Sequence, residues 1–548
     1  MKTKILFLIF TFTYFLSLYA QVQLEWVQRY NGPGNSDDRQ NRLAIDPSGN
    51  VYIGGASVGI GTSYDCAVVK YNTSGVEQWV QRYNGPANGQ DWILFITLDK
   101  HGNVIVTGTS ERTGTTDDIV TIKYNSDGVQ QWVQIYISPA EGWNQGSSIA
   151  IDQFGSVFVI GRSVGVGTDY DYATIKYNSD GIQQWVQRYN GPGNYWDMVW
   201  DIAVDRSGDV YITGSSFGSG TDYDVATIKY NSEGIEQWVQ RYNGPGNGWD
   251  DAFNIAVDRL DNVYVSGRST GIGTGFDWTV IKYNSDGVEQ WVERYNGPGN
   301  GWDGAGSIAV HPSGSIYVTG SSIGTGTGFD YNTIKYNSDG VRQWMQRYNG
   351  TGNGQDNAFS IALDPKGSAY VTGASIGSGT SLDYATIKYN KSGVQQWVER
   401  YNGPANDWDM VSNIAVHPSG DVYVTRMSAG IGTGLDYATI KYSKAHGNTV
   451  LGINYISNEL PVKFELYQNY PNPFNPNTKI RFDLPKSGDV KLTVFDVLGR
   501  EVTVLANEKL SPGKYEADFD GTNYPSGVYY YRITSGDFID VKKMILIK

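Results

Sequence analysis

The chain has 548 residues and a net charge of −14, with 68 glycines, 40 tyrosines and one cysteine, Cys66. This length exceeds the roughly 250–300 residues at which a single core usually splits into domains. One cysteine excludes an intrachain disulfide framework. The glycine- and aromatic-rich composition favours an all-β protein. The acidic excess lies in residues 21–442, which makes nucleic acid a poor candidate partner.

The first twenty residues have the features of a secretion signal. Lys2 and Lys4 make the start basic, the run from Ile5 to Leu18 is mainly apolar, and Ala20 is a small residue at its end. The apolar run is short for a membrane span, which needs about 20 residues. We therefore predict a cleaved signal peptide over residues 1–20 and no transmembrane segment in the mature protein.

A strict repeat fills most of the chain. Eight tryptophans follow one another at intervals of 53 residues: Trp26, Trp79, Trp132, Trp185, Trp238, Trp291, Trp344 and Trp397. Each unit holds apolar or alternating runs separated by Gly-containing turns, and in the unit that starts at Ile202 the expected strands are 202–204, 210–214, 224–230 and 235–242. Four short antiparallel strands in each unit of this length are typical of a β-propeller blade.

Counting the strands predicts how the ring closes. The first three strands occur eight times, whereas the fourth follows only seven of them, because Tyr442 is followed by SKAHGNTV with no Gln-Trp. The segment QVQLEWVQRY, residues 21–30, has the sequence of the missing fourth strand. We expect it to complete the last blade and to remove the open edge between the first and last blades.

The repeats resemble the bacterial β-propeller repeat family called SBBP, in stretches such as LAIDPSGNVYIGG, IAVDRSGDVYITG and DYATIKYNSDG. The resemblance covers nearly all of residues 21–442. It implies a propeller fold and no defined activity. The family name refers to seven blades, whereas this chain has eight units, so an eight-bladed ring is expected and a seven-bladed one is the alternative.

After a linker at 443–460 the composition changes, and residues 461–548 form a separate predicted domain. Runs at 479–482, 490–495 and 528–533 alternate as short strands of a small β-sandwich. The motifs NYPNPFNP, VLGRE, SGVYY and KMILIK resemble the type A sorting domain of the type IX secretion system. The matching positions include Asn469, Pro471, Asn472, Pro473, Phe474, Gly499, Gly527 and Lys543.

The sorting-domain resemblance implies an export route. It implies passage through the periplasm and across an outer membrane, contact with the type IX secretion machinery, and removal of residues 461–548 by its sortase. The mature protein would then be extracellular or attached to the cell surface, and the resemblance leaves the choice between release and attachment open. A generic adhesion module is the alternative interpretation of the domain.

Histidine and cysteine are too scarce for most catalytic sites. His101, His311 and His417 fall in turns between first and second strands, and His446 falls in the linker. Zinc sites, Ser-His-Asp triads and thiol chemistry are therefore disfavoured. A pair of carboxylates could still act on a glycan, so an enzyme is not excluded, although a non-enzyme is favoured.

Two aspartate series recur in the units, one in the third strand and one in the loop between blades. Both are expected on one face, where they would either bind a cation such as Ca²⁺ or accept backbone N–H bonds in their own loops. The structural role is favoured, no cofactor is predicted, and calcium is kept as an alternative. The metal candidates are Asp171, Asp197, Asp224, Asp250, Asp277 and Asp303.

The inter-blade loops of five units carry a further tryptophan: Trp143, Trp196, Trp249, Trp302 and Trp408. Aromatic rings beside carboxylates suit sugar stacking, whereas packing between blades is the structural alternative. Units two and three also depart from the repeat at three charged residues, Glu111, Arg112 and Glu141. Such departures are expected either at a specific ligand site or as sequence drift.

Three hypotheses follow for the function. The favoured one is a secreted or surface-displayed β-propeller that binds glycan or protein ligands without catalysis. The second is a glycan-acting lyase or hydrolase that uses carboxylates of the propeller face. The third is a purely structural surface or adhesion protein.

Overall fold

The computed structural model describes residues 22–112, 116–444, 453–457, 461–486, 488–510, 512–522 and 524–548. The chain divides into two compact units, 1–445 and 446–548. The predicted signal peptide and most of the predicted linker lie outside the described residues. In the part of the chain that is described, no helix has the length and apolar character needed to cross a membrane.

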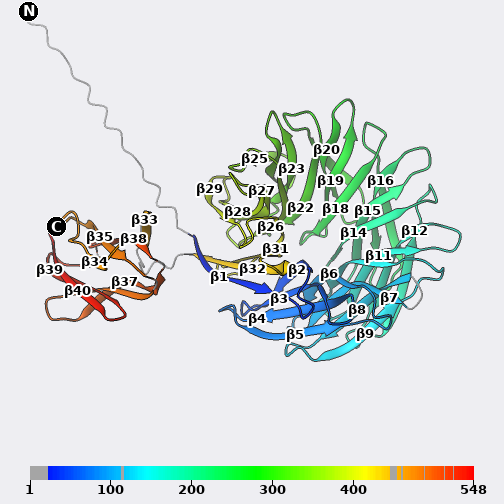
Figure 1. Ribbon diagram of the computed structural model, residues 1–548. Helices are drawn as coiled ribbons and strands as arrows, with labels where there is room; N and C mark the ends of the chain where they lie inside the picture. The colour runs from blue at the N-terminus through cyan, green and yellow to red at the C-terminus, as the bar shows by residue number, and fades with distance from the viewer. Residues whose placement is uncertain are drawn as a thin grey trace, which may run out of the picture. The chain divides into compact units, whose positions relative to one another are not determined.

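The first unit is a closed propeller of eight four-stranded antiparallel blades. Figure 1 shows the blades following one another around a central axis in chain order. Blade 1 contains β2 to β5, each later blade takes the next four strands up to β29, and blade 8 contains β30, β31, β32 and β1. The expected eight-bladed all-β fold is confirmed.

The innermost strands of blades 1 to 8 are β2 (Asp38–Ile45), β6 (Asp91–Leu98), β10 (Gln145–Ile151), β14 (Asp197–Val204), β18 (Asp250–Val257), β22 (Asp303–Val310), β26 (Asp356–Leu363) and β30 (Asp409–Val416). The second strands are β3 (Val51–Val58), β7 (Val104–Arg112), β11 (Val157–Val164), β15 (Val210–Phe217), β19 (Val263–Gly271), β23 (Ile316–Gly324), β27 (Ala369–Ile376) and β31 (Val422–Gly430).

The third strands are β4 (Tyr64–Tyr71), β8 (Thr116–Tyr124), β12 (Tyr170–Tyr177), β16 (Tyr223–Tyr230), β20 (Gly275–Tyr283), β24 (Gly328–Tyr336), β28 (Leu382–Tyr389) and β32 (Gly434–Lys444). The outermost strands are β5 (Glu77–Tyr83), β9 (Gln130–Tyr136), β13 (Gln183–Tyr189), β17 (Glu236–Tyr242), β21 (Glu289–Tyr295), β25 (Arg342–Tyr348), β29 (Gln395–Tyr401) and β1 (Val22–Tyr30).

Each innermost strand contains a β-bulge at the same place. In blade 4, Val199 pairs with Gly214 and Asp201 pairs with Thr213, so Trp200 is the extra residue. A Cβ added to Gly214 would lie only 2.1 Å from the carbonyl oxygen of Met198, so a side chain there would require the two strands of this blade to move apart. The bulge presents two consecutive residues of each innermost strand towards the middle of the ring.

Apolar side chains fill the space between neighbouring blades. Between blades 3 and 4, for example, Phe158 and Ile160 pack with Val199 and Ile212 in one buried cluster. Seven of the eight period-marking tryptophans add a polar contact to this packing, because their indole Nε1 donates to a carbonyl in the last hairpin of the following blade. Trp185 donates to Ser232 at 3.2 Å, and the same contact is made by Trp26, Trp79, Trp132, Trp238, Trp291 and Trp344.

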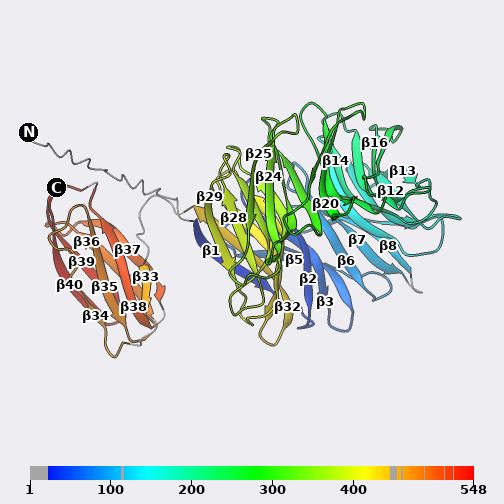
Figure 2. The same cartoon turned by 90° about the horizontal axis from the view of Figure 1, so that it is seen from above.

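Strand β1 closes the ring. It pairs antiparallel with β32 from Val22 opposite Lys444 to Tyr30 opposite Tyr437, and blue β1 lies beside the yellow strands of blade 8 in both views (Figure 1, Figure 2). Trp26 then reaches the hairpin of blade 1 through its 3.1 Å bond to the Thr73 carbonyl. The predicted closure by the N-terminal strand is confirmed.

The second unit is a β-sandwich of two four-stranded sheets, as the alternation predicts. One sheet has the order β33-β38-β35-β34 and the other β37-β36-β39-β40. Phe482 and Leu492 are among the fully buried residues of its core. The strands are β33 (Ile453–Ser457), β34 (Glu465–Leu466), β35 (Asn477–Leu484), β36 (Gly488–Phe495), β37 (Glu501–Leu510), β38 (Gly513–Asp520), β39 (Gly527–Ser535) and β40 (Phe538–Leu546).

The closure can be tested at Trp26. We expect Trp26→Ala to destabilise the propeller by about 2–3 kcal/mol, because it removes a half-buried indole that joins blade 8 to blade 1. Leu24→Ala is the matched control on the same strand, since Leu24 is 50% exposed. The check is thermal unfolding of both variants, and equal melting temperatures would contradict a joining role for Trp26.

Candidate functional site

The aspartates of the third strands are held by arginines of the outermost strands. Asp224 pairs with Arg241 at 2.8 Å. The same guanidinium donates to Ser216 Oγ and to the hydroxyl of Tyr189 in the preceding blade. The equivalent ion pairs are Arg29–Asp436, Arg82–Asp65, Arg188–Asp171, Arg294–Asp277, Arg347–Asp330 and Arg400–Asp383.

Blade 2 lacks this arginine, because Ile135 occupies its position. Arg112 takes over the contact, with its Nε 3.3 Å from a carboxylate oxygen of Asp118. Glu111 accepts a 2.9 Å hydrogen bond from the backbone N–H of Gln90, whereas Glu141 is exposed in its loop. The structure therefore gives Arg112 and Glu111 local partners within the blade.

Arg112 can be tested as a replacement for the missing arginine. We expect Arg112→Gln to lower the free energy of unfolding by about 1–3 kcal/mol, because buried Asp118 loses its counter-charge and Arg112 itself is about one-third exposed. Ile135→Arg in that background should recover most of the loss by restoring the pair found in seven blades. Denaturant unfolding provides the measurement, and a double variant no more stable than Arg112→Gln would contradict this role.

The aspartates that begin the innermost strands hold the inter-blade loops. Asp197 accepts the backbone N–H of Gly191 at 2.7 Å and that of Phe217 at 3.2 Å. The loop glycine makes the same bond to Asp38, Asp91, Asp250, Asp303, Asp356 and Asp409. In blade 3 the amide of Asn144 serves instead, with Val164 N–H as one donor at 3.3 Å.

The six metal candidates therefore have other partners in this structure. Asp171, Asp224 and Asp277 pair with arginines, while Asp197, Asp250 and Asp303 accept loop N–H groups. Among the described residues, no three His, Cys, Asp or Glu side chains gather in a group that could hold a metal ion. Both aspartate series lie beside the loops of one face, as expected. In blade 4 the inter-blade loop and the end of the second strand are in contact there, because Gly193 N–H donates to the Phe217 carbonyl at 3.0 Å.

Burial of the loop aspartates makes stability depend on pH. Burial raises the pKa of Asp197 to about 6. A raised folded-state pKa stabilises the fold below the unfolded value, near 4, and this contribution disappears as pH rises to about 6. Relative to the wild type, Asp197→Asn should therefore be about 3 kcal/mol more stable at pH 7 than at pH 4.

The measurement is denaturant unfolding of wild type and Asp197→Asn between pH 4 and 7. Asn144 shows that asparagine fits this position. Exposed Asp339→Asn serves as the control. Parallel stability curves for wild type and Asp197→Asn would contradict the raised pKa.

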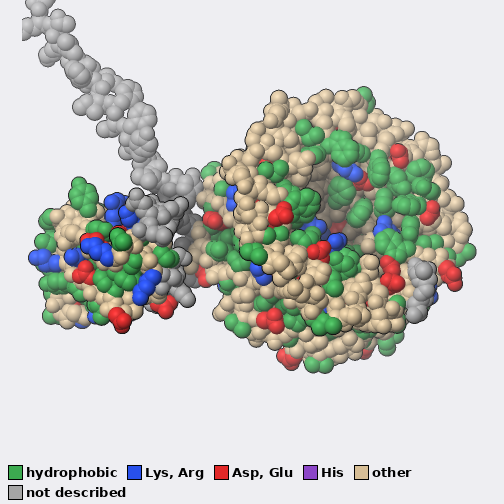
Figure 3. Space-filling view, viewed as in Figure 1, with side chains coloured by type: hydrophobic (Ala, Val, Ile, Leu, Met, Phe, Trp, Pro, Cys, Tyr) green, Lys and Arg blue, Asp and Glu red, His purple; other side chains and the backbone are tan. Residues whose placement is uncertain are grey.

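The predicted tryptophans of the inter-blade loops are exposed on the propeller face. Trp143, Trp196 and Trp249 are 36%, 38% and 37% exposed, and Trp302 and Trp408 are 54% and 59% exposed. They are not buried between blades. In the view along the axis, apolar side chains gather around a hollow at the centre of the ring (Figure 3).

Ring contacts join three of these tryptophans into one arc, which we call the aromatic arc. It runs through Trp143, Tyr170, Trp196, Tyr195, Phe217, Tyr223 and Trp249, with successive ring centroids 4.8–6.5 Å apart. Trp302 packs edge-on against Phe276 at 5.1 Å. Trp408 lies further round the ring, beyond the loop in which Gln355 replaces the tryptophan.

Arginines of the second strands lie against these rings. The Arg162 guanidinium is 4.4 Å from the ring centroid of Trp143. Arg268 lies 4.3 Å from Phe276 and 5.5 Å from Trp302, and it also pairs with Asp251 at 2.8 Å. The sequence-predicted site residues did not include Tyr170, Tyr195, Phe217, Tyr223 or these arginines, because they belong to different strands and loops that only the fold brings together.

A cavity of about 390 Å³ occupies the central channel at the level of the bulges. It is lined by Trp200, Phe253 and Phe359 and by Arg42. None of these residues was predicted as a site residue. The signal that could have identified them is the difference between units at these two positions, because the apolar residues that follow them are similar in every unit.

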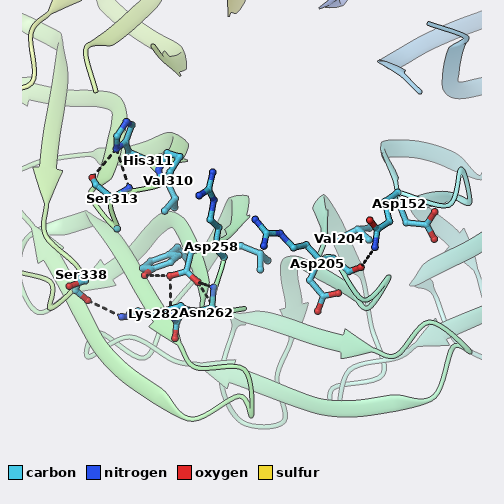
Figure 4. A pocket seen from close by; sticks show the side chains of 18 of the residues that line it. Asp152, Val204, Asp205, Asp258, Asn262, Lys282, Val310, His311, Ser313 and Ser338 are labelled. Atoms are coloured by element: carbon cyan, nitrogen blue, oxygen red, sulfur yellow. Dashed lines mark hydrogen bonds between the residues drawn. The ribbon is translucent and has the colours of Figure 1, made fainter. Parts of the chain in front are cut away.

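The opposite mouth of the channel is wider, with a cavity of about 770 Å³ lined by the first hairpins of blades 3 to 6. Figure 4 shows His311 and Ser313 at one side and Asp152 at the other. Asp258 accepts from Asn262 and Tyr264, and His311 contacts Ser313 Oγ at 2.8 Å. The labelled polar groups mostly stabilise their own hairpins, and the three histidines of the described residues lie in separate turns, as expected.

The sorting-motif residues lie together in the sandwich. Asn469 is 2% exposed, and its Nδ2 donates to the Pro471 carbonyl and to Thr478. Asn472 Oδ1 accepts the Ile545 N–H at 2.9 Å, and Phe474 N–H donates to the Ile545 carbonyl. The first motif is thereby tied to the last strand, which carries Lys543; Pro473 lies within that motif, Gly499 in a turn with positive φ, and Gly527 at the start of β39.

Family comparisons agree with this architecture. Residues 468–548 match the model of the secretion system C-terminal sorting domain. The C-terminal domain is a type IX secretion sorting domain. Residues 25–59 and 237–273 match the beta-propeller repeat called SBBP. The chain is thus a β-propeller protein exported by the type IX secretion system to the cell surface or beyond.

Similar solved structures are remote, and no curated protein shows significant similarity to the chain. PorZ, a surface component of the type IX secretion system of Porphyromonas gingivalis, is 15% identical, with a TM-score of 0.41 over 91% of this chain and 64% of PorZ. The structure of Drosophila Plexin A in complex with Semaphorin 1b gives 9% identity and a TM-score of 0.37 over 79% of this chain and 90% of the matched chain. An apocarotenoid oxygenase of Synechocystis is 10% identical, with a TM-score of 0.33 over 77% of this chain and 93% of the oxygenase. None of these similarities carries an inference about a ligand or a partner.

Proposed function

We propose that the propeller is a non-catalytic binding scaffold that holds a glycan chain along the aromatic arc on its face. The observation that carries the proposal is the continuous run of ring contacts from Trp143 to Trp249, with its tryptophans about one-third exposed. Rings presented side by side offer flat apolar surfaces to successive sugars. A curved row of such surfaces suits an extended polymer better than a single small molecule.

Charged groups around the arc support recognition of hydroxyl groups. Trp249 Nε1 donates to Asp251 at 2.6 Å, and Trp143 Nε1 donates to Asp117. Carboxylates and guanidinium groups beside the rings supply acceptors and donors that fix a sugar's orientation. The regular aspartate series are engaged by arginines and loop N–H groups, which favours binding over acid–base catalysis by those carboxylates.

We further propose how the protein reaches its site of action. The sorting domain would engage the secretion machinery, be removed by the sortase of that system, and leave the propeller released or attached outside the cell. Glycan binding would then occur at the cell surface or in the medium.

Replacement of two rings tests the glycan proposal. Trp196→Ala with Trp249→Ala should weaken binding to a responsive glycan at least tenfold, because two sugar units would each lose the ring on which they stack. The melting temperature should fall little, since both rings are partly exposed. Trp408→Ala, which lies outside the arc, serves as the matched control.

The measurement is a glycan array followed by titration of the best ligand. An array with no binding would refute the proposal, and so would a double variant that binds as tightly as the wild type. Turnover of the bound polymer would favour the enzymatic alternative.

A further inference from the structure

The units differ from one another where they face the central channel. The two bulge positions hold different pairs in successive blades, such as Leu94-Phe95, Ser147-Ser148, Trp200-Asp201, Phe253-Asn254, Gly306-Ser307 and Phe359-Ser360. The next residue is isoleucine in every blade except the first, where it is Leu43. A ring of eight equivalent positions with only a structural role needs no such differences. The channel is therefore chemically unequal on its different sides.

The hydrogen-bond acceptors of the channel are already used. Asp201 Oδ1 accepts from Ser148 at 3.1 Å, and its Oδ2 accepts from Asn254 Nδ2 at 2.7 Å and from Ile255 N–H at 3.0 Å. Asn254 Oδ1 in turn accepts the N–H of Ile308 at 3.1 Å. Asp201 and Asn254 thus link one blade to the next.

Two guanidinium groups come from blades 1 and 8, those of Arg42 and Arg426. Burial lowers the pKa of Arg42, and the negative charge of Asp201 acts against this lowering. Arg42 lies 5.2 Å from the ring centroid of Phe95, and no carboxylate of the described residues forms an ion pair with it. Arg426 replaces the glycine that the other seven blades have at this place. Its Nε is buried without a hydrogen-bond partner among the described residues. Burial lowers the pKa of Arg426, and the positive charge of Arg42 adds to this lowering.

The channel also has an aromatic wall that continues onto the propeller face. Trp200 is 43% exposed and lines the 390 Å³ cavity together with Phe253 and Arg42. The Arg268 guanidinium lies 5.5 Å from the ring centroid of Phe253 and 5.5 Å from that of Trp302. One side chain therefore connects the channel lining with the exposed rings, and the cavity volume lies within the range of about 300–1,000 Å³ typical of small-ligand sites.

We propose that the channel binds the carboxylate of an acidic sugar unit, with Arg42 as its donor, Arg426 as an additional positive charge behind the channel wall and Trp200 as its stacking surface. This inference rests on the proposed glycan binding and specifies its ligand as a uronate-containing glycan. Guanidinium groups bind carboxylates through paired, charge-assisted hydrogen bonds. Because the chain has a net charge of −14, a polyanion gains no general attraction to it, and a preference for acidic glycan has to come from a local site.

The test uses the full mature chain with alginate and polygalacturonate, each compared with the same polymer after its carboxyl groups have been reduced to alcohols. We expect at least one carboxylated polymer to bind at least tenfold more tightly than its reduced form, with a change in tryptophan fluorescence. Arg42→Gln should abolish this preference, so that the carboxylated and reduced polymers bind with similar affinity. Arg426→Gly should do the same while restoring the residue of the other blades. Arg342→Gln on outermost strand β25 is the matched control.

The possible outcomes separate the two proposals. Equal affinities for carboxylated and reduced polymers would overturn the channel site and leave glycan binding along the arc intact. An unchanged preference in both arginine variants would also overturn it, as would equally tight binding of a sulfated galactan that has no carboxylate. Failure of every polymer to bind would refute the proposed function, and the channel proposal with it.

Discussion

Pairing of β1 with β32 is the constraint on which the rest of the propeller depends. Every blade shares its apolar face with the next, so an unclosed ring would leave two blade faces and one sheet edge in water. Residues from opposite ends of the propeller meet in blade 8, where Arg29 pairs with Asp436 at 2.9 Å. Trp26 of the closing strand also contacts blade 1, because its Nε1 donates to a carbonyl in the last hairpin of that blade. The N-terminal strand therefore completes both the last blade and the last junction.

The uniform positions of the repeat serve the junctions. The tryptophan, the arginine–aspartate pair and the aspartate that caps the loop recur because each junction needs the same contacts. Blade 2 illustrates this need: with Ile135 in place of the arginine, Arg112 reaches buried Asp118 from another strand. A departure from the repeat that looks like a ligand site in sequence is thus explained by a missing partner elsewhere in the blade.

The sequence was sufficient to predict the blade number, the closing strand and the sandwich, because these follow from counting regular units. It was not sufficient for the inner strands, which begin at the aspartates such as Asp197 and were expected to start five residues later, at Ile202. The bulge explains this error, since an extra residue such as Trp200 interrupts the two-residue alternation by which strands are recognised. For the same reason, the residues that face the channel could not be predicted from the sequence. The exposed loop tryptophans could be identified from their spacing, whereas the tyrosines and Phe217 that join them into an arc come from different strands and loops, which only the fold brings together.

Symmetry explains why recognition should reside where the repeats differ. Eight equal blades present eight equal surfaces, and a ligand that is not itself eightfold cannot be positioned uniquely by them. The aromatic arc covers only part of the face, because Asp37, Gln90 and Gln355 replace the loop tryptophan in three units. The channel is equally one-sided, because Asp201 accepts hydrogen bonds from neighbouring blades, whereas Arg426 Nε has no hydrogen-bond partner among the described residues. Arg268 connects the channel with the exposed rings of the face, because its guanidinium lies near Phe253 of the channel and Trp302 of the face. A polymer lying along the arc could therefore place a charged unit in the channel without any change in the junctions that hold the ring together.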